Sequence, residues 1–327
     1  MTTKLAFNQE TLLFRTDVLV AGTRCLVSTN SCDILRAAAQ SPRDTQRSCT
    51  PSFEMEVMVE SALDVVPEHA AHFRGNRHLV FAKLPPRSFI AFDLLRRRVH
   101  AVLSNAAARD LSFWNTRLLP ITIGVLGTTL GVVPLHCACL DRNGSAALIA
   151  GVSGAGKSTL ATAMSQLGFA LLSDDWTYIS KHRSALLAHG LYSPLKLLPD
   201  AARFFPVLRH FSPRRSLNGE LAYEIESVQS IGLSATGISR PACIFFLERT
   251  SAPGCYLLRC HSEYVREFFT KNVERLPDEL PAAKACRASI IKVLSDRPSW
   301  ILRTGESPQV TAEHLNDFLL EADRATA

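Results

Sequence analysis

The sequence has no C-x-x-C pair, so it lacks the usual ligand spacing of a structural zinc site. It shows neither an internal repeat nor a low-complexity segment, which excludes repeat and collagen-like architectures. Lysine is scarce, at eight of the 36 Lys and Arg residues, and the net charge is only +6. Because no aromatic–basic interleaving accompanies the arginines, we expect no nucleic-acid partner.

The composition of the chain is that of a folded protein. Its 327 residues are 47% hydrophobic and 20% charged, which is typical of globular rather than disordered sequences. A chain of this length is long enough for two domains. It contains nine cysteines and begins without a signal-peptide pattern, so we expect reduced thiols and a cytoplasmic location.

One long apolar stretch requires a test against a membrane span. Leu118–Leu140 contains no Asp, Glu, Lys or Arg and is long enough to cross a bilayer. The same stretch contains two prolines, three glycines and His136, which disfavour a spanning helix. We therefore expect a buried helix followed by a buried strand, and no membrane span.

Short apolar runs alternate with turn signals in the first part of the chain. Strands are expected at Asp17–Ala21, Phe53–Val59 and Ser88–Asp93, and a polar loop at Ser41–Ser52. This pattern predicts a smaller α+β domain over residues 1–115. No chemical motif lies in it, so partner recognition is the role that we expect for it.

The second part, residues 116–327, predicts an α/β domain with a mixed sheet. Two apolar runs, Leu135–Leu140 and Ser145–Ala150, flank a D-R-N-G turn and predict a β-hairpin. Ser158–Leu167 has the apolar spacing of a helix, and Gly168 is expected to end it.

Further core elements are expected toward the end of the chain. Ala242–Leu247 and Ser299–Arg303 are typical of strands, whereas Glu263–Phe269 and Ala282–Leu294 are typical of helices. A last amphipathic helix is expected through Ala322, and its cap is expected at Thr311.

A phosphate-binding pattern follows the hairpin. Gly151–Ser158 reads GVSGAGKS and matches the P-loop pattern G-x-x-x-x-G-K-[ST]. Its glycines let backbone N–H groups approach phosphate oxygens, and the next helix adds a partial positive charge. Lys157 would contact the β- and γ-phosphates, and the Ser158 hydroxyl would ligate Mg²⁺. The sequence therefore predicts binding of ATP with Mg²⁺. The expected nucleotide-binding residues are Gly151, Ser153, Gly154, Ala155, Gly156, Lys157, Ser158 and Thr159.

Two adjacent acids follow the next expected strand, Phe169–Leu172. The C-terminal edge of an α/β sheet lies beside the P-loop, so Asp174 and Asp175 can both approach the phosphates. One carboxylate would ligate Mg²⁺ while the other accepts the proton of an incoming hydroxyl. The alternative is one metal-binding acid with a solvated neighbour, as in P-loop ATPases. His136, on the strand before the hairpin, has either a catalytic role or that of a buried core histidine.

Together, His136, the loop GVSGAGKS and the acidic pair in Leu171–Asp175 (LLSDD) resemble the catalytic domain of HPr kinase/phosphorylase. The resemblance implies a P-loop nucleotide-binding domain of the HPr kinase type, with Asp174 as catalytic base and Asp175 as a Mg²⁺ ligand. His136 would orient or assist that base. HPr kinases assemble as hexamers, but the partial resemblance does not carry this over, and a homo-oligomer is one of the states left open for this chain. The same elements are similar to the core of phosphoenolpyruvate carboxykinase, whose chains are much longer.

Two positions depart from the family pattern. After the acidic pair the family has a Glu followed by Arg-Gly-Leu-Gly, whereas Gly190–Pro199 (GLYSPLKLLP) contains no acid in the corresponding positions. Thr159 stands where the family has a Glu after the P-loop Ser. Lys196 would either meet an anionic group or be an ordinary surface lysine, and we expect the second.

The predicted function is a kinase that transfers the γ-phosphoryl group of ATP–Mg²⁺ to a serine hydroxyl of a protein or peptide. The alternative is a nucleotide-binding ATPase or switch that passes no phosphate to a partner. The acid missing from Gly190–Pro199 favours this alternative. The two hypotheses differ in where the γ-phosphate appears, which is on an acceptor or as free phosphate.

Overall fold

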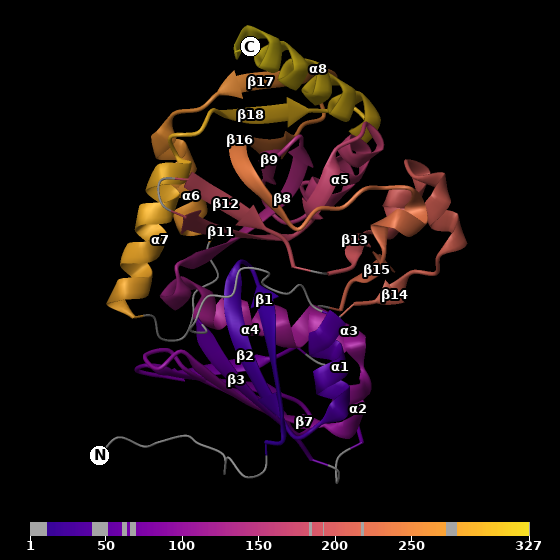
Figure 1. Ribbon diagram of the computed structural model, residues 1–327. Helices are drawn as coiled ribbons and strands as arrows, with labels where there is room; N and C mark the ends of the chain where they lie inside the picture. Colours follow the sequence, from indigo (N-terminus) through magenta and orange to yellow (C-terminus); the bar gives the residue numbers. More distant parts are fainter. Residues whose placement is uncertain are drawn as a thin grey trace. The chain divides into compact units, whose positions relative to one another are not determined.

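The computed structural model describes residues 12–40, 52–60, 64–65, 70–182, 185–191, 193–216, 219–272 and 280–326. These residues divide into two compact units. The first takes the described residues of Met1–Val133 and Glu274–Arg287, and the second those of Pro134–Val273 and Ala288–Ala327. Both units are mixed α/β structures (Figure 1). The expected start of a domain at residue 116 stays a prediction.

The first unit is built on a seven-stranded mixed sheet with the strand order β1-β2-β3-β7-β6-β5-β4. The β2–β3 and β3–β7 pairs are parallel, and the other neighbouring pairs are antiparallel. The strands are β1 (Phe14–Val20), β2 (Thr23–Thr29), β3 (Phe53–Glu60), β4 (His72–Asn76), β5 (Leu79–Leu84), β6 (Ser88–Asp93) and β7 (Arg98–Ser104). The helical segments are α1 (Cys32–Gln40), α2 (Asn105–Arg109), α3 (Leu111–Phe113), η2 (Trp114–Leu118), α4 (Leu119–Leu126) and η3 (Gly127–Leu130).

The strands expected in this unit are confirmed, as β1, β3 and β6. The expected loop Ser41–Ser52 lies outside the described residues except for Ser52. The apolar stretch Leu118–Leu140 is a buried helix followed by a strand, as expected, because α4 is followed by η3 and β8 (Val132–Arg142). Among the described residues, no helix combines the length and the apolar character needed to cross a membrane.

The second unit contains an eight-stranded mixed sheet and a separate three-stranded sheet. The larger sheet has the order β10-β8-β11-β12-β16-β18-β17, and β9 pairs with both β8 and β16. Its strands, besides β8, are β9 (Ser145–Ala150), β10 (Ala170–Ser173), β11 (Trp176–His182), β12 (Ala185–His189), β16 (Ile238–Arg249), β17 (Cys255–Arg259) and β18 (Ser299–Thr304). The smaller sheet consists of β13 (Leu195–Leu197), β14 (Arg214–Arg215) and β15 (Leu221–Ile225).

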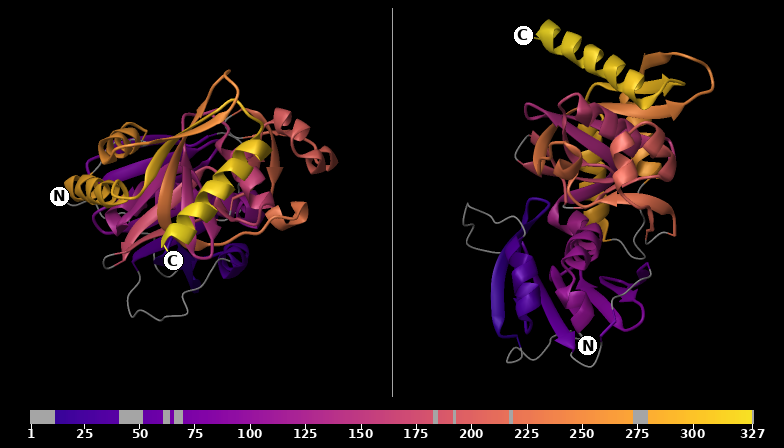
Figure 2. Two further views of the ribbon diagram at one scale, coloured as in Figure 1. Left: turned by 90° about the horizontal axis from the view of Figure 1, so that it is seen from above. Right: turned by 90° about the vertical axis from the view of Figure 1, so that its right-hand side faces the viewer.

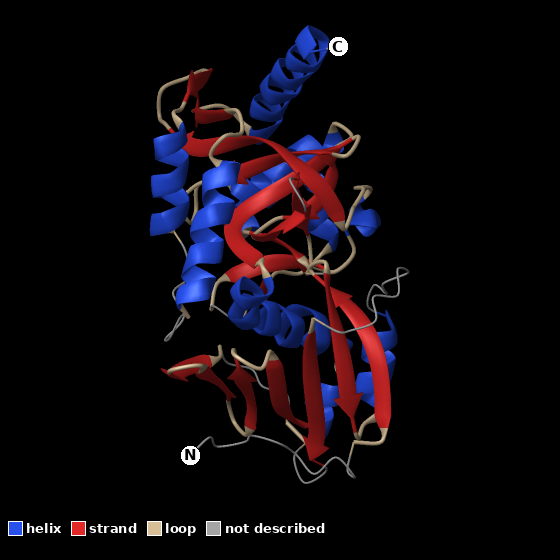
Figure 3. Ribbon diagram, turned by 60° about the vertical axis from the view of Figure 1, so that its left-hand side comes forward, coloured by secondary structure: helices blue, strands red, loops and turns tan. Residues whose placement is uncertain are grey.

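Helices flank the strongly twisted strands of the larger sheet (Figures 2 and 3). They are α5 (Lys157–Gln166), α6 (Ser262–Lys271) and α8 (Pro308–Thr326), with the short turns η4 (Pro199–Arg203), η5 (Pro206–His210) and η6 (Val228–Ile231). Helix α7 (Pro281–Leu294) contributes residues to both units. Helix α5 packs against α8, and its buried Leu160 and Met164 join a core that includes Phe245 of β16. Helix α5, which follows the glycine-rich segment, is therefore packed against the sheet.

The hairpin before the glycine-rich segment forms as expected. β8 and β9 pair antiparallel, with Arg142 opposite Ser145. Asn143 and Gly144 between them have φ values of 55° and 81°, the left-handed conformations that a two-residue hairpin turn requires. Gly168, with φ 93°, follows the end of α5, which confirms the expected helix stop.

The expected cap of the last helix at Thr311 is wrong. Helix α8 begins at Pro308, and the hydroxyl of Ser307 accepts a hydrogen bond from the Val310 N–H at 3.3 Å. Thr311 lies within the first turns and is 1% exposed, where its hydroxyl donates to the Ser307 carbonyl oxygen at 2.9 Å. The Ser-Pro pair was the better signal, because proline favours the first position of a helix. The other elements expected in this part of the chain are confirmed as β16, β18, α6 and α7.

Candidate active site

A glycine-rich loop joins strand β9 to helix α5. A Cβ atom at Gly151 would lie 2.9 Å from the carbonyl oxygen of Leu247, so this position has no room for a larger residue. Gly156 precedes the helix with φ 97°, a left-handed conformation that glycine adopts without strain. Because the first N–H groups of a helix have no partner within it, the loop leads into a set of backbone donors.

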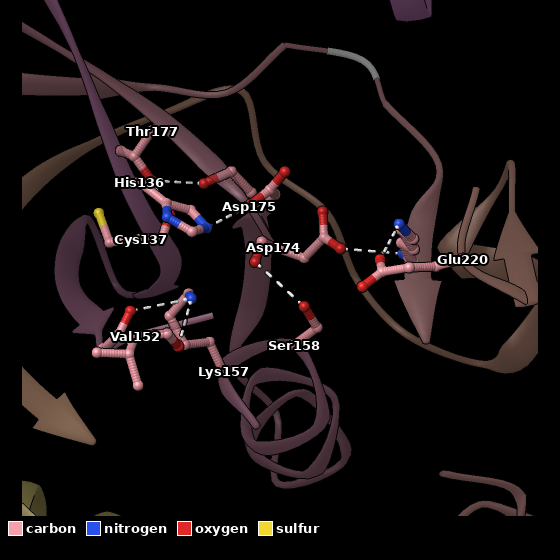
Figure 4. A network of polar contacts seen from close by, with 12 residues as sticks. His136, Cys137, Val152, Lys157, Ser158, Asp174, Asp175, Thr177 and Glu220 are labelled. Carbon is pink, nitrogen blue, oxygen red and sulfur yellow. Dashed lines mark hydrogen bonds and ion pairs between the residues drawn. The ribbon is translucent and has the colours of Figure 1, made fainter. Parts of the chain in front are cut away.

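Lys157 is the first residue of α5 and is only 6% exposed. Its Nζ atom donates to the carbonyl oxygens of Gly151 at 3.1 Å and Val152 at 3.3 Å. Burial lowers the pKa of Lys157, while the negative charge of Asp175 acts in the opposite direction. The ammonium group therefore lies inside the loop and within electrostatic range of the acidic pair (Figure 4).

The acidic pair reaches the glycine-rich loop through the direction of the strands. β8 is antiparallel to both β9 and β10, so the C-terminal ends of β9 and β10 lie at the same edge of the sheet. Asp174 and Asp175 follow the end of β10 directly. The Ser158 hydroxyl of α5 donates to the backbone carbonyl oxygen of Asp174 at 3.4 Å. The structure thus brings together the lysine, the serine and the two acids that the sequence singled out.

Asp174 is the buried member of the pair, with 4% of its surface exposed. Burial raises the pKa of its carboxyl group to about 7, and the neighbouring charge of Asp175 adds to this effect. A hydrogen bond from the Lys196 N–H to Asp174 Oδ2, at 2.9 Å, opposes the shift. A carboxyl group with a pKa near neutrality can both accept and release a proton under ordinary conditions.

Asp175 is the open member of the pair, with 57% of its side chain exposed. Its Oδ1 atom lies 2.8 Å from Nε2 of His136 on β8, and the His136 ring stacks on Trp176 with the ring centroids 5.3 Å apart. Figure 4 shows the imidazole pointing at Asp175. The resemblance implied that His136 would assist Asp174. In the structure its partner is Asp175, because β8 places the ring beside the second acid.

Hydroxyl groups fix the backbone around the acids. The Thr177 hydroxyl donates to the carbonyl oxygen of Cys137 at 2.8 Å and lies 2.6 Å from the Ser173 hydroxyl. These buried contacts join the segment on both sides of the acidic pair to β8, the strand that carries His136. The separation between His136 and the acids is therefore set by strand β8 and not by a free loop.

Lys196 contacts two acids, and the sequence did not reveal the contact made through its backbone. Its backbone N–H binds Asp174, and its ammonium group lies 2.8 Å from Glu220 Oε2. Glu220 was missed, because it precedes a short strand and carries no local motif. It brings a carboxylate close to a segment, Gly190–Pro199, in which the expected acid is missing.

The remaining residues expected to bind nucleotide differ in their exposure to solvent. Ser153 and Gly154 are exposed, whereas Ala155 is 7% exposed and its N–H donates to the Val152 carbonyl oxygen at 3.2 Å. Thr159 is partly buried in the first turn of α5. That these residues bind a nucleotide stays a prediction.

The donor set at the loop suits a hard divalent cation. Ser158 offers a hydroxyl, and Asp175 is open to solvent with only Oδ1 in contact with His136. Within the described residues, no cluster of three or more His, Cys, Asp or Glu side chains could hold a metal ion. Mg²⁺ is bound in such sites by one or two carboxylates together with phosphate oxygens and water, rather than by a cage of protein ligands. The residues present therefore fit Mg²⁺ bound together with a phosphate.

These observations define a mixed α/β protein with a glycine-rich loop between a strand and a helix, and a buried lysine, two aspartates and a histidine at one sheet edge. No family model and no curated protein sequence matches the chain. Among solved structures, the Hpr(Ser) kinase/phosphatase from Coxiella burnetii is similar at 12% sequence identity, over 58% of this chain and 98% of that one. The TM-score of 0.32 is too low for this likeness to support a shared fold or function.

Proposed function

We propose that this protein is a kinase that transfers the γ-phosphoryl group of ATP–Mg²⁺ to a serine hydroxyl of a protein or peptide. The observation that carries the proposal is the position of Asp174. It is a buried carboxyl group with a pKa raised to about 7, in hydrogen-bond contact with Ser158 through its backbone and next to the loop that holds Lys157. A purely metal-binding acid would need no such shift.

The glycine-rich loop has the parts of a P-loop. Its backbone N–H groups and the N-terminus of α5 are suited to phosphate oxygens, and the ammonium of Lys157 adds a buried positive charge. A phosphate group on the loop would offer Lys157 a charged partner in place of the carbonyl oxygens of Gly151 and Val152. This exchange would bring the γ-phosphoryl group toward the acids.

Asp174 would act as the general base of the transfer. The acceptor oxygen bonds to the γ-phosphorus as the bond from phosphorus to the β–γ bridging oxygen breaks, and ADP leaves. The hydroxyl proton passes to the Asp174 carboxylate. The Lys196 N–H holds this carboxylate in place through Oδ2.

Ser158 and Asp175 would hold Mg²⁺, which neutralises charge on the phosphates when it is bound. His136 would act as a positioning residue, because it contacts Asp175 and is itself held by stacking on Trp176. Asp174 and Asp175 would thus differ in function as they differ in exposure.

The test is transfer of label from [γ-³²P]ATP to candidate serine-containing proteins and peptides, including those encoded beside the gene. The wild type should label at least one acceptor, and Asp174→Asn should reduce transfer by about 10²- to 10⁴-fold while ATP binding is retained. Asp317→Asn, on helix α8, is the matched control and should keep wild-type transfer. Near-normal transfer by Asp174→Asn would show that Asp174 is not the general base. Label found only as free phosphate would favour the ATPase or switch.

A further inference from the structure

A cavity of about 120 Å³ adjoins the glycine-rich loop and the first turn of helix α5. Gly154–Gly156 and Thr159 line it, whereas Lys157, Ser158 and the acidic pair are not among its lining residues. Lys157 and Ser158, by contrast, contact Gly151, Val152 and the Asp174 backbone. The cavity therefore adjoins the loop without including the lysine, the serine or the two acids of the candidate active site.

The cavity combines apolar surface with charged groups. Leu160, Leu247, Phe204 and Pro308 supply carbon surface. Arg203 and Arg249 add two guanidinium groups, and Asp200 adds one carboxylate. Ligand sites typically show this mixture of apolar lining and a few polar groups.

The walls of the cavity are held by contacts between distant segments. Gln309 Nε2 donates to the Phe204 carbonyl oxygen at 2.9 Å, which ties the segment after η4 to the start of α8. Arg249 Nη1 donates to the Glu306 carbonyl oxygen at 2.9 Å, at the end of β16. Because β16 is parallel to both of its neighbours, β9 and β18, the C-terminal ends of these three strands lie at the edge that carries the loop.

A flat stacking surface lies at the cavity. The guanidinium carbon of Arg203 is 4.5 Å from the centroid of the Phe204 ring. Aromatic rings and guanidinium planes are the side-chain surfaces on which nucleobases stack. Asp200, whose Oδ2 lies 3.7 Å from Arg203 Nη2, adds an acceptor for the N–H groups of a base.

The size of the cavity limits what it can hold. Pockets that enclose a whole drug-sized ligand measure roughly 300–1,000 Å³. At about 120 Å³ this cavity has room for part of such a ligand, in the range of a single ring system. A ligand that fills it must extend beyond it, and the adjoining surface is the glycine-rich loop.

We infer that this cavity binds the nucleobase of the nucleotide whose phosphates occupy the glycine-rich loop, with the base stacked on the Phe204–Arg203 pair. The inference rests on the proposed function, since it requires a nucleotide on the loop. It names Phe204, Arg203 and Asp200 as the residues that determine affinity for the base. Gly154–Gly156 then lie under the phosphates that link the two sites.

The experiment compares ATP, GTP and inorganic tripolyphosphate, each with Mg²⁺, by calorimetric titration of the full chain. Wild type should bind ATP or GTP at least about tenfold more tightly than tripolyphosphate, because base stacking contributes by that order. Phe204→Leu and Arg203→Ala should each remove most of this difference and leave tripolyphosphate affinity unchanged. Phe211→Leu and Arg209→Ala are the matched controls, since Phe211 packs on the same core and Arg209 is exposed, and neither lines the cavity.

The outcomes separate the inference from the proposed function. Equal affinities for ATP in the wild type and Phe204→Leu, or equal affinities of the wild type for ATP, GTP and tripolyphosphate, would overturn the base site even if the protein transfers phosphate. A dependence of ATP affinity on Phe204 without transfer of label would support the base site and reject the kinase. Lys157→Ala should weaken all three ligands, and an unchanged affinity would place the nucleotide away from the loop and reject both.

Discussion

The two units each contain a histidine–carboxylate contact of nearly the same length in very different surroundings. In the seven-stranded sheet, His100 Nδ1 lies 2.9 Å from Glu56 Oε2, with side-chain exposures of 4% and 14%. In the eight-stranded sheet, His136 Nε2 lies 2.8 Å from Asp175 Oδ1, with exposures of 29% and 57%. The two pairs contain the same chemical groups, but the pair in the eight-stranded sheet is far more accessible to solvent and ligands.

The difference follows from where each pair lies on its sheet. His100 and Glu56 are register partners on the parallel strands β7 and β3, so both are held by backbone pairing along the strands. His136 is on a strand, but Asp175 follows the end of β10, at the edge that carries the glycine-rich loop. Only the second pair can exchange a protein contact for a ligand contact. We therefore expect substitutions in the first pair to change stability and those in the second to change phosphotransfer.

The largest effect is expected from the carboxylates. Asp175→Asn should lower phosphotransfer by more than about a hundredfold, because outer residues that only hold a metal ligand already contribute about 10- to 100-fold. Glu56→Gln should leave transfer per folded molecule unchanged. The measurement is initial transfer rate as a function of Mg²⁺ concentration, and Asp175→Asn should need more Mg²⁺. Equal losses of transfer in Asp175→Asn and Glu56→Gln would show that the two histidine–carboxylate pairs do not differ in function.

A smaller effect is expected from the histidines. His136→Gln removes the side chain that holds Asp175, and should lower transfer by about 10- to 100-fold and raise the Mg²⁺ concentration for half-maximal rate. His100→Gln should instead reduce the free energy of unfolding by about 1–3 kcal/mol, since it disturbs a buried polar contact. Urea unfolding and Mg²⁺ titration of both variants distinguish these results. A His136→Gln variant with reduced stability and an unchanged Mg²⁺ requirement would make His136 structural.

Local patterns in the sequence were enough to predict the loop and its flanking elements. The D-R-N-G turn predicts the β8–β9 hairpin because Asn143 and Gly144 adopt left-handed conformations easily, and the Gly-rich run predicts the start of α5. The acidic pair was placed correctly at the sheet edge because β10 follows α5 at once. These features depend on residues close together in the sequence.

The rest depends on contacts between distant segments, which one sequence does not reveal. The pairing of His136 with Asp175 rather than Asp174 follows from the register of β8 against its neighbours. Glu220 contacts Lys196, and Phe204 lines the cavity beside the loop, and both residues come from segments without a motif.

The last prediction concerns the stability cost of the buried acid at the candidate active site. The pKa of Asp174 is raised to about 7 in the folded protein, from about 3.9 in the unfolded chain. Below about pH 3.9 the group is protonated in both states. Between about pH 3.9 and pH 7 the unfolded chain ionises this carboxyl group while the folded protein keeps it protonated, so the folded state loses stability as the pH rises, and the loss is complete above about pH 7.

Asp174→Asn removes this pH-dependent cost, and its amide oxygen can still accept the Lys196 N–H. The variant should therefore gain stability over wild type as the pH rises from about 4 to 7, by at most on the order of 4 kcal/mol, and keep a constant advantage above that. Unfolding free energies of the wild type and Asp174→Asn at pH 5, 6, 7 and 8 test this. An Asp174→Asn advantage that shrinks as the pH rises would mean that the buried carboxylate is stabilised in the folded state, and the base assignment would lose its physical support.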